Sequence, residues 1–367
     1  MKNGPIVLVG GGTGGHIFPL VAVAEELQVR KQPFVYIGSA DGPEAGIIAG
    51  HGWEFEAIAA GKWRRYRTVA SILQNVADVF RTVKGFFQAV RLLRRLDAQL
   101  VVSKGGYVAV PVLYAARLIG CPVIVHESDA VMGLANKIGS KFAQKVLTAF
   151  DPAVLDGDGR FVKVGIPVRR ALIQAARLRS PKKDRPVLLI LPGSQGSMAI
   201  NRYVKEGMAE FLGKYDIIHL TGEPDYQVFA EIKRALPKNL AARYKPYPFI
   251  ERELPYYYQA ADLIIARSSA TTMAEAALFK KPLYVVPLPQ SANNHQQRNA
   301  QLLEASGAVM VRQQYQLSTE QLLTDIESLL SNPERLLAMG ESLGRYFDSA
   351  TATGRMIGEI SNVAAQK

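Results

Sequence analysis

Two short apolar strands that each run into a glycine-rich loop constrain the fold of this 367-residue chain most strongly. The first strand, 6–9, continues into the loop 10–16, and the second, 187–191, continues into the loop 192–197. A strand, a glycine loop and a following helix allow backbone N–H groups to approach an anionic ligand without obstruction by Cβ atoms. Because the unit opens each half of the chain, the sequence predicts two Rossmann-like halves that face one cleft.

Short β-type runs alternate with helical patterns in both halves, which predicts parallel sheets with right-handed crossovers. Strands are expected at 6–9, 34–37, 100–103, 123–126, 145–147, 187–191, 217–220, 244–249, 263–266 and 282–286, with helices over 168–177 and from Ser318, Pro333 and about Thr353. The length fits two α/β domains. We expect an acceptor-binding, membrane-associating domain at 1–165, a UDP-sugar-binding domain at 166–345, and a C-terminal helix at 346–367 that packs back on the first domain.

The composition excludes several classes of protein. With 48% hydrophobic and 21% charged residues, the chain is expected to be folded and globular. The first apolar strand ends at glycine, where the apolar region of a secretory signal would continue, so no signal peptide is expected. Proline, arginine and glycine interrupt the longest apolar stretch, 107–125, so no membrane-spanning helix is expected there. The single cysteine, Cys121, begins an apolar strand and fits a buried structural role in a reducing compartment. A location on the cytoplasmic side is therefore expected.

The net charge of +12 is distributed unevenly. Segment 61–104 combines ten basic residues with two acids, and could meet nucleic acid, an anionic membrane or a phosphorylated substrate. Its apolar residues recur at helical spacing, at Val76, Val79, Phe80, Val83, Phe86 and Phe87. One interpretation is an ordinary helix that buries one face. The other keeps some aromatic residues exposed beside the cations, which would form an interfacial membrane surface.

A glycine loop alone does not distinguish a sugar nucleotide from a nicotinamide cofactor. A nicotinamide-binding fold places an acid at the end of its second strand, where it binds the ribose hydroxyls. Here that strand ends in Gly38 and Ser39, and Asp41 lies several residues further on. This pattern argues against an oxidoreductase.

Candidate ligand-binding residues follow three strands of the first half. His16 closes the first loop, where it could deprotonate an attacking hydroxyl, cap the helix or contact a phosphate. The pair Gly105 and Gly106 could form a backbone-lined pocket for a second diphosphate. Glu127 and Asp129 follow another strand and could face the ligand or serve in turns and caps.

In the second half, the run 266–275 leaves a strand and enters a helix that Ser268 or Ser269 could cap. Its first turn suits a phosphate. Glu275 could accept ribose hydroxyls or could simply be a first-turn acid that the helix dipole favours. The amide-rich stretch 293–297 suits a sugar. The histidines do not have metal-ligand spacing, and no acid pair forms a metal-binding motif.

Taken together, these residues resemble the MurG family of peptidoglycan glycosyltransferases over nearly the whole chain. The matching motifs are 11–16, 104–108, 126–128, 133–137, 167–169 and 193–196, together with Arg267, Ser268, Glu275 and Gln296. The resemblance implies a GT-B α/β fold with two Rossmann-like domains. It also implies an inverting, metal-independent transferase without a cofactor, which moves N-acetylglucosamine from its UDP donor to undecaprenyl-diphosphoryl-N-acetylmuramoyl-pentapeptide. The implied location is peripheral, on the anionic inner leaflet of the cell membrane, with no nucleic-acid partner.

The resemblance also implies roles for individual residues. His16 and Glu127 match catalytic positions, with Asp129 as a further candidate for sharing the base role. Acceptor binding is implied for Lys104, Gly105, Gly106, Tyr107 and Asn136. Contacts with the sugar nucleotide are implied for Thr13, Gly14, Gly15, Asp129, Arg169, Ser194, Ile250, Ala270, Thr271, Thr272, Glu275, Gln296 and Gln297.

Four positions depart from the pattern common in the family, which has asparagine at Asp129, glycine at Pro192, asparagine at Ile166 and aspartate at Asn294. Of these, Asp129 puts a sugar contact in doubt. A GT-B glycosyltransferase that acts on another lipid, such as diacylglycerol, is the closest alternative. A noncatalytic protein that binds nucleotide sugar or nucleic acid is a more distant one.

Overall fold

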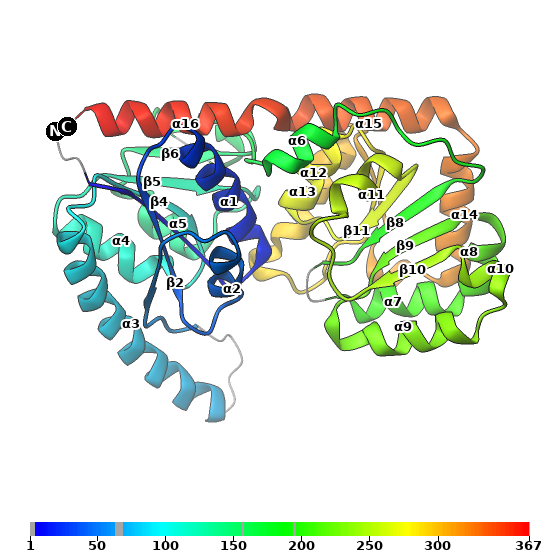
Figure 1. Cartoon of the computed structure of the whole chain (residues 1–367), viewed down its shortest axis with the longest axis horizontal. Helices are drawn as coiled ribbons and strands as arrows, with labels where there is room; N and C mark the ends of the chain where they lie inside the picture. The colour runs from blue at the N-terminus through cyan, green and yellow to red at the C-terminus, as the bar shows by residue number, and fades with distance from the viewer. Residues whose placement is uncertain (1–3, 63–68, 156–157, 194–195, 367) are drawn as a thin grey trace. The chain divides into compact units, whose positions relative to one another are not determined.

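A computed structural model of the chain describes residues 4–62, 69–155, 158–193 and 196–366. It divides into two compact units (Figure 1). The first contains Met1–Arg169 and Thr351–Lys367, and the second contains Arg170–Ala350. No helix in the described part of the chain is both long enough and apolar enough to cross a bilayer.

The first unit is built on a seven-stranded sheet of order β3-β2-β1-β4-β5-β6-β7, in which every neighbouring pair is parallel. Its strands are β1 (Ile6–Gly10), β2 (Phe34–Ser39), β3 (Phe55–Ile58), β4 (Leu100–Gly105), β5 (Val123–Glu127), β6 (Lys145–Thr148) and β7 (Phe161–Lys163). Its helices are α1 (Gly14–Val29), α2 (Pro43–Gly50), α3 (Val69–Arg95), α4 (Ala109–Leu118) and α5 (Leu134–Gly139), with a 3-10 turn at Pro152–Leu155. The predicted parallel sheet is confirmed.

Alternating strand residues serve two separate cores, because successive side chains point to opposite faces of a sheet. Ile6 and Leu8 pack with α1 and with four residues of the last helix, α16 (Ser349–Ala365): Met356, Ile357, Ile360 and Val363. Val7 and Val9 pack on the other face with α3, α4 and α5. Both faces are therefore covered, as a parallel sheet requires.

The second unit has a six-stranded parallel sheet of order β10-β9-β8-β11-β12-β13. Its strands are β8 (Val187–Leu191), β9 (Asp216–Leu220), β10 (Tyr244–Tyr247), β11 (Leu263–Ala266), β12 (Leu283–Val285) and β13 (Val309–Val311). Its helices are α6 (Arg170–Ala175), α7 (Met198–Glu206), α8 (Met208–Lys214), α9 (Glu223–Ala235), α10 (Lys238–Ala241), α11 (Leu254–Ala260), α12 (Ala270–Leu278), α13 (His295–Ala305), α14 (Thr319–Leu330) and α15 (Pro333–Phe347), with 3-10 turns at Ala292–Asn294 and Gln314–Gln316.

All ten predicted strands are present, and the three strands that the sequence did not predict, β3, β7 and β13, are edge strands. β3 and β7 are partly exposed and contain the charged residues Glu56 and Lys163, and β13 is an apolar run of only three residues, so none has the long apolar run of a central parallel strand. The predicted starts of α14 and α15 are confirmed. Ser318 accepts a hydrogen bond from the Gln321 N–H and Asn332 accepts one from the Arg335 N–H.

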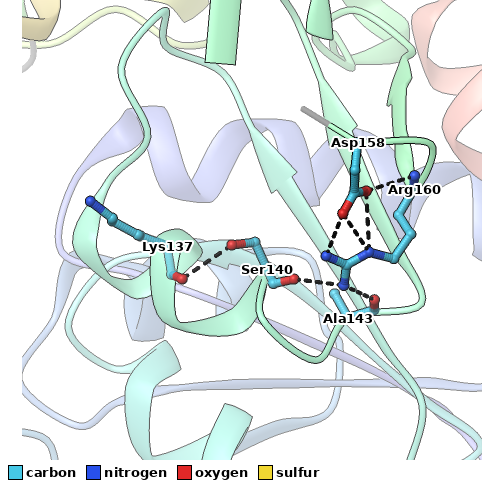
Figure 2. Close-up of polar contacts among 5 residues, drawn as sticks. All are labelled: Lys137, Ser140, Ala143, Asp158 and Arg160. Carbon is cyan, nitrogen blue, oxygen red and sulfur yellow. Dashed lines mark hydrogen bonds and ion pairs between the residues drawn. The ribbon is translucent and has the colours of Figure 1, made fainter. Parts of the chain in front are cut away.

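A polar cluster fixes the end of α5, the helix that carries Asn136 (Figure 2). One guanidinium nitrogen of Arg160 donates to the carbonyl oxygens of Ser140 and Ala143, at 2.9 and 3.2 Å. Another lies 2.7 Å from Asp158 Oδ2, and the Ser140 hydroxyl donates to the Lys137 carbonyl. These bonds satisfy carbonyl groups at and just beyond the C-terminus of α5 and tie it to the segment that enters β7.

Candidate functional site

The order of each sheet determines where a ligand can bind. In the first sheet the order reverses between β1 and β4, and in the second between β8 and β11. Such a switch point separates the loops that follow the two strands, and leaves room at the carboxyl edge of the sheet. The loops that follow these strands are the two glycine loops, the pair Gly105 and Gly106, and the segment that begins α12.

The two loops of the first unit touch each other. Gly106 has a φ of +83°, and a Cβ there would lie 2.6 Å from the Gly11 carbonyl oxygen and 3.4 Å from His16 Nδ1. A side chain at this position would both strain the backbone and collide with the neighbouring loop. Glycine at 106 is therefore required by the approach of the two loops.

The contacts of His16 determine its tautomer. Its Nδ1 lies 3.2 Å from the Gly11 carbonyl oxygen and 3.3 Å from Thr13 Oγ1. Since a carbonyl oxygen can only accept, Nδ1 carries the proton and the lone pair of the neutral ring lies on Nε2. In this tautomer Nε2 is the ring nitrogen that can take a proton.

Glu127 is 3% exposed, and its carboxylate holds the loop that follows β5. Oε1 accepts from the Asp129 N–H at 2.9 Å, and Oε2 accepts from the Gly133 N–H and from Asn136 Nδ2, both at 2.9 Å. These bonds give Glu127 a structural task beside its predicted catalytic one. Asp129 is only partly buried and is the better placed of the two carboxylates to meet a ligand.

Buried charges surround this loop. Burial lowers the pKa of Lys104, while the charges of Glu127 and Asp129 oppose that shift. Burial, reinforced by the charge of Asp129, raises the pKa of Glu127. His126 is fully buried, and burial together with the charge of Lys104 lowers its pKa to about 3. His126 therefore stays neutral, with Nε2 donating to the Gly165 carbonyl at 2.8 Å.

Several buried polar atoms at this edge lack a hydrogen-bond partner within the described part of the chain. They include His126 Nδ1, Ser128 Oγ and Asn136 Oδ1. Buried polar atoms are rarely left in this state unless water or a ligand satisfies them. Arg169, the last residue of the first unit, packs its guanidinium 4.5 Å from the centre of the Phe18 ring on α1.

Sequence reasoning missed Glu44, which is fully buried on α2. Its oxygens accept from the N–H groups of Gly12 and Ser39 and from the Ser39 hydroxyl. The sequence offers one signal, an acid in the first turn of a helix that begins with Pro43. That signal cannot reveal that the side chain turns inward.

In the second unit, the N-terminus of α12 is open to an anion. Ser269, one of the two expected candidates, occupies the N-cap position, but within the described part of the chain its side chain makes no cap bond, and Ser268 donates its hydroxyl to the Gln296 carbonyl at 2.8 Å. The first-turn N–H groups of Ala270, Thr271 and Thr272 thus keep their capacity to bind a phosphate.

Glu275 is 6% exposed and lies beyond the first turn of α12, so the alternative of a first-turn acid is wrong. The hydroxyl of Tyr258 donates to Glu275 Oε2 at 2.9 Å. Tyr258 is itself fixed by stacking on Phe279, with ring centres 5.3 Å apart. The carboxylate therefore has a defined orientation at the edge of the sheet.

The loop before α13 has an unusual backbone. Asn293 and Asn294 both have positive φ, 55° and 54°, a conformation that asparagine tolerates better than most residues. Gln296 Oε1 accepts from the Leu288 N–H at 3.0 Å, which closes the loop. Within the described part of the chain no hydrogen bond of Gln296 Nε2 is present, so this amide group can donate to a ligand.

Arg267 has a structural role. Its guanidinium donates to Ser197 Oγ at 2.6 Å, to Gln314 Oε1 at 2.8 Å, and to the carbonyls of Val286 and Pro287. It thus ties the end of β11 to the N-cap of α7 and to the segment after β13. Burial lowers its pKa to about 10.

The predicted site residues fall into two groups, each within one unit. The first unit contains Thr13–His16, Lys104–Tyr107, Glu127, Asp129, Asn136 and Arg169, all at or near the carboxyl edge of its sheet. The second contains Ile250, which is buried between β10 and α11, together with Ala270–Thr272, Glu275, Gln296 and Gln297. Ser194 lies outside the described residues. Within the described part, no three His, Cys, Asp or Glu residues are grouped so that they could hold a metal ion.

Comparisons with known proteins agree over nearly the whole chain. The N-terminal domain of glycosyltransferase family 28 matches residues 6–148, and the C-terminal domain of that family matches residues 187–352. The UDP-N-acetylglucosamine--N-acetylmuramyl-(pentapeptide) pyrophosphoryl-undecaprenol N-acetylglucosamine transferase of Clostridium botulinum is 37% identical over 337 residues, which cover 89% of this chain and 91% of that protein. The chain belongs to the MurG family.

Solved structures agree with the MurG assignment. The crystal structure of Acinetobacter baumannii MurG has a TM-score of 0.74 and 28% identity, with 98% of this chain and 99% of that chain covered. A Staphylococcus aureus MnaA–UDP structure, at 13% identity and a TM-score of 0.69 with coverage of 98% and 96%, shares the fold alone. The expected GT-B class with two Rossmann-like domains is confirmed, and the chain is a glycosyltransferase rather than an oxidoreductase or a noncatalytic binding protein.

Proposed function

We infer that this enzyme transfers N-acetylglucosamine from UDP-N-acetylglucosamine to undecaprenyl-diphosphoryl-N-acetylmuramoyl-pentapeptide. The observation that carries the inference is the 37% identity over 89% of the chain to a transferase named for this reaction. Anion-binding loops at the switch points of both sheets fit a reaction in which donor and acceptor each contain a diphosphate.

The proposed chemistry is a single displacement. His16 Nε2 takes the proton of the acceptor sugar hydroxyl, whose oxygen attacks the anomeric carbon of the donor. The bond from that carbon to the diphosphate oxygen breaks, its electron pair stays on UDP, and the configuration inverts. The tautomer that Gly11 imposes on His16 supports this assignment. Asp129 could help to accept the proton.

The leaving diphosphate gains negative charge as the bond breaks. We assign its stabilisation to Arg169, to N–H groups near Ser194 and to the start of α12 at Thr271 and Thr272, without a metal ion or cofactor. The open N-terminus of α12 supports this proposal. Ribose binding is assigned to Glu275, a uracil contact to the backbone of Ile250, and sugar binding to Gln296 and Gln297.

An acceptor assay tests the proposed function directly. The purified enzyme with labelled UDP-N-acetylglucosamine is expected to glycosylate the muramoyl lipid and to leave diacylglycerol unmodified, with the product identified by mass. Addition of EDTA is expected to leave the rate unchanged. Transfer to diacylglycerol but not to the muramoyl lipid would overturn the proposed acceptor, and loss of activity with EDTA would overturn the metal-independent step.

We also propose that α3 attaches the enzyme peripherally to the anionic inner leaflet. Five apolar side chains of α3 have exposed fractions between 49% and 71%: Val76 53%, Val79 49%, Phe80 71%, Val83 50% and Phe87 65%. The exposed cations Arg81, Lys84, Arg91, Arg94 and Arg95 lie on the same helix. This exposure supports the interfacial interpretation rather than a helix that buries its whole apolar stripe. Arg64, Arg65 and Arg67 of the same basic segment lie outside the described residues.

Packing explains why this stripe faces outward. A Cβ at Gly85 would lie 1.8 Å from the Ala59 carbonyl oxygen, so this helix face packs directly on the backbone. Asp78 is also buried on this face, at 4% exposure. Around Asp78 and Gly85, α3 therefore turns small and polar residues inward, and the five apolar side chains named above remain largely outside.

The membrane proposal predicts the effect of removing the exposed aromatics. Replacing Phe80 and Phe87 together with alanine is expected to weaken binding to vesicles that contain anionic lipid by about tenfold or more, because each ring contributes about 1.5–3 kcal/mol when it is fully buried. Reversing the charges of Arg91 and Arg94 is expected to weaken binding to the same vesicles, with a larger effect at low salt than at high salt. Vesicle sedimentation measures both effects. Tyr315→Ala, at a side chain 78% exposed in the other unit, is the matched control. Unchanged sedimentation of both variants would contradict the proposal.

A further inference from the structure

Glu44 is an internal anion placed against the first glycine loop. Its side chain is 0% exposed, and Oε2 accepts from the Gly12 N–H at 3.1 Å. Oε1 accepts from the N–H and the hydroxyl of Ser39, at 3.0 and 2.8 Å. The carboxylate thus joins the loop after β1 to the end of β2.

This arrangement changes the meaning of the glycines in the loop. A Cβ at Gly11 would lie 2.4 Å from Glu44 Oε1, and one at Gly42 would lie 2.3 Å from the same oxygen. These glycines are needed to admit the carboxylate of the protein itself. Because Glu44 takes the N–H groups of Gly12 and Ser39, a ligand anion must use other donors, such as the first turn of α1.

The same carboxylate sets the direction of a hydrogen-bond chain. Since the Ser39 hydroxyl donates to Glu44, the contact of 2.8 Å between Ser39 Oγ and Tyr107 Oη must be donated by Tyr107. The ring of Tyr107 lies against Gly12, where a Cβ would be 2.9 Å from its Cε1. The ammonium of Lys62 lies 5.2 Å from the centre of the same ring. The second loop is therefore fixed to the first through Ser39.

We propose that Glu44 is a positioning residue for the acceptor. Through Ser39 and Tyr107 it holds the loops 10–16 and 104–107 in one arrangement, so that the lipid-linked acceptor meets a preformed site beside His16. The proposal rests on the proposed function, since it takes His16 and the loop 104–107 as the parts of the site that meet the acceptor. The donor contacts of the second unit do not depend on it.

A double-mutant cycle tests the chain of bonds. Ser39→Ala and Tyr107→Phe are each expected to lower kcat/KM for the acceptor about tenfold, as loss of one buried hydrogen bond predicts. The double variant is expected to be no worse than either single variant, because both changes remove the same link. The affinity for UDP, measured by calorimetry, is expected to stay unchanged. Independent, multiplying losses, or an equal loss of UDP affinity, would overturn the proposal.

A second measurement does not depend on catalysis. Glu44→Gln keeps the size of the side chain but places an NH2 group against donors, so amide hydrogen exchange in segment 10–16 is expected to accelerate at least tenfold. Ser39→Ala is expected to accelerate exchange in segment 104–108. Glu54→Gln makes the same chemical change at an exposed position of the same unit, and is the control. Unchanged hydrogen exchange in both segments would refute the positioning role of Glu44. If the wild-type enzyme does not glycosylate the muramoyl lipid, that result would refute the proposed function alone.

Discussion

Replacing His16 with alanine is expected to lower kcat about 1000-fold, within the range that general acid–base catalysis supplies. The acceptor hydroxyl loses its proton as it attacks, and without Nε2 the proton must pass to water. Binding of UDP is expected to remain within about twofold, because His16 is not among the residues assigned to the uracil, ribose or diphosphate of UDP. Initial rates at saturating donor and acceptor measure kcat, and calorimetry measures the dissociation constant of UDP.

Two further variants sharpen this test. His51→Ala removes an exposed histidine of the same unit and is expected to leave kcat unchanged. Asp129→Asn removes the other group that could accept the proton without changing the size of the side chain. A large loss in Asp129→Asn together with full activity in His16→Ala would move the base to Asp129. Equal loss of UDP affinity in His16→Ala would instead indicate that the histidine binds the donor.

Most of the fold could be predicted from the sequence, because central parallel strands are buried on both faces and read as continuous apolar runs. The edge strands β3 and β7 were missed because Glu56 and Lys163 interrupt their apolar pattern, and β13 because its apolar run is only three residues long. Motif spacing located both groups of candidate site residues, but it could not give the orientation of any side chain.

Side-chain contacts account for what the sequence could not give. Glu127 was predicted as catalytic, yet its oxygens hold three donors of the loop after β5. Glu44 was not predicted at all, since an acid in a first helical turn normally faces solvent, and only the packing of α2 against β2 turns it inward. Ser269 is the N-cap residue of α12 as predicted, but the sequence could not show that Ser268 donates across the loop to the Gln296 carbonyl. The Glu44–Gly12 and Ser268–Gln296 contacts join residues distant in sequence, and those of Glu127 depend on how the loop after β5 folds back on its carboxylate.

Replacing Glu275 with alanine is expected to weaken UDP binding about 100-fold. The carboxylate would accept charge-assisted hydrogen bonds from two ribose hydroxyls, each worth about 1.5–3 kcal/mol. Water that enters the variant site compensates for part of this loss. With saturating donor, kcat is expected to change little, since the ribose contact is made equally in the ground state and the transition state. Calorimetric titration with UDP measures the affinity, and steady-state rates measure kcat.

The bond from Tyr258 separates ribose binding from a merely structural role of Glu275. Tyr258→Phe removes the hydroxyl that orients the carboxylate, so UDP affinity is expected to fall by less than in Glu275→Ala, about threefold to tenfold. If Glu275 only satisfied the buried hydroxyl of Tyr258, both variants would lower the melting temperature and neither would change UDP affinity. The double variant Tyr258→Phe with Glu275→Ala removes both members of this bond, so it is expected to recover part of the thermal stability that Glu275→Ala loses, without recovering UDP binding. Recovery of binding in the double variant would contradict the ribose role.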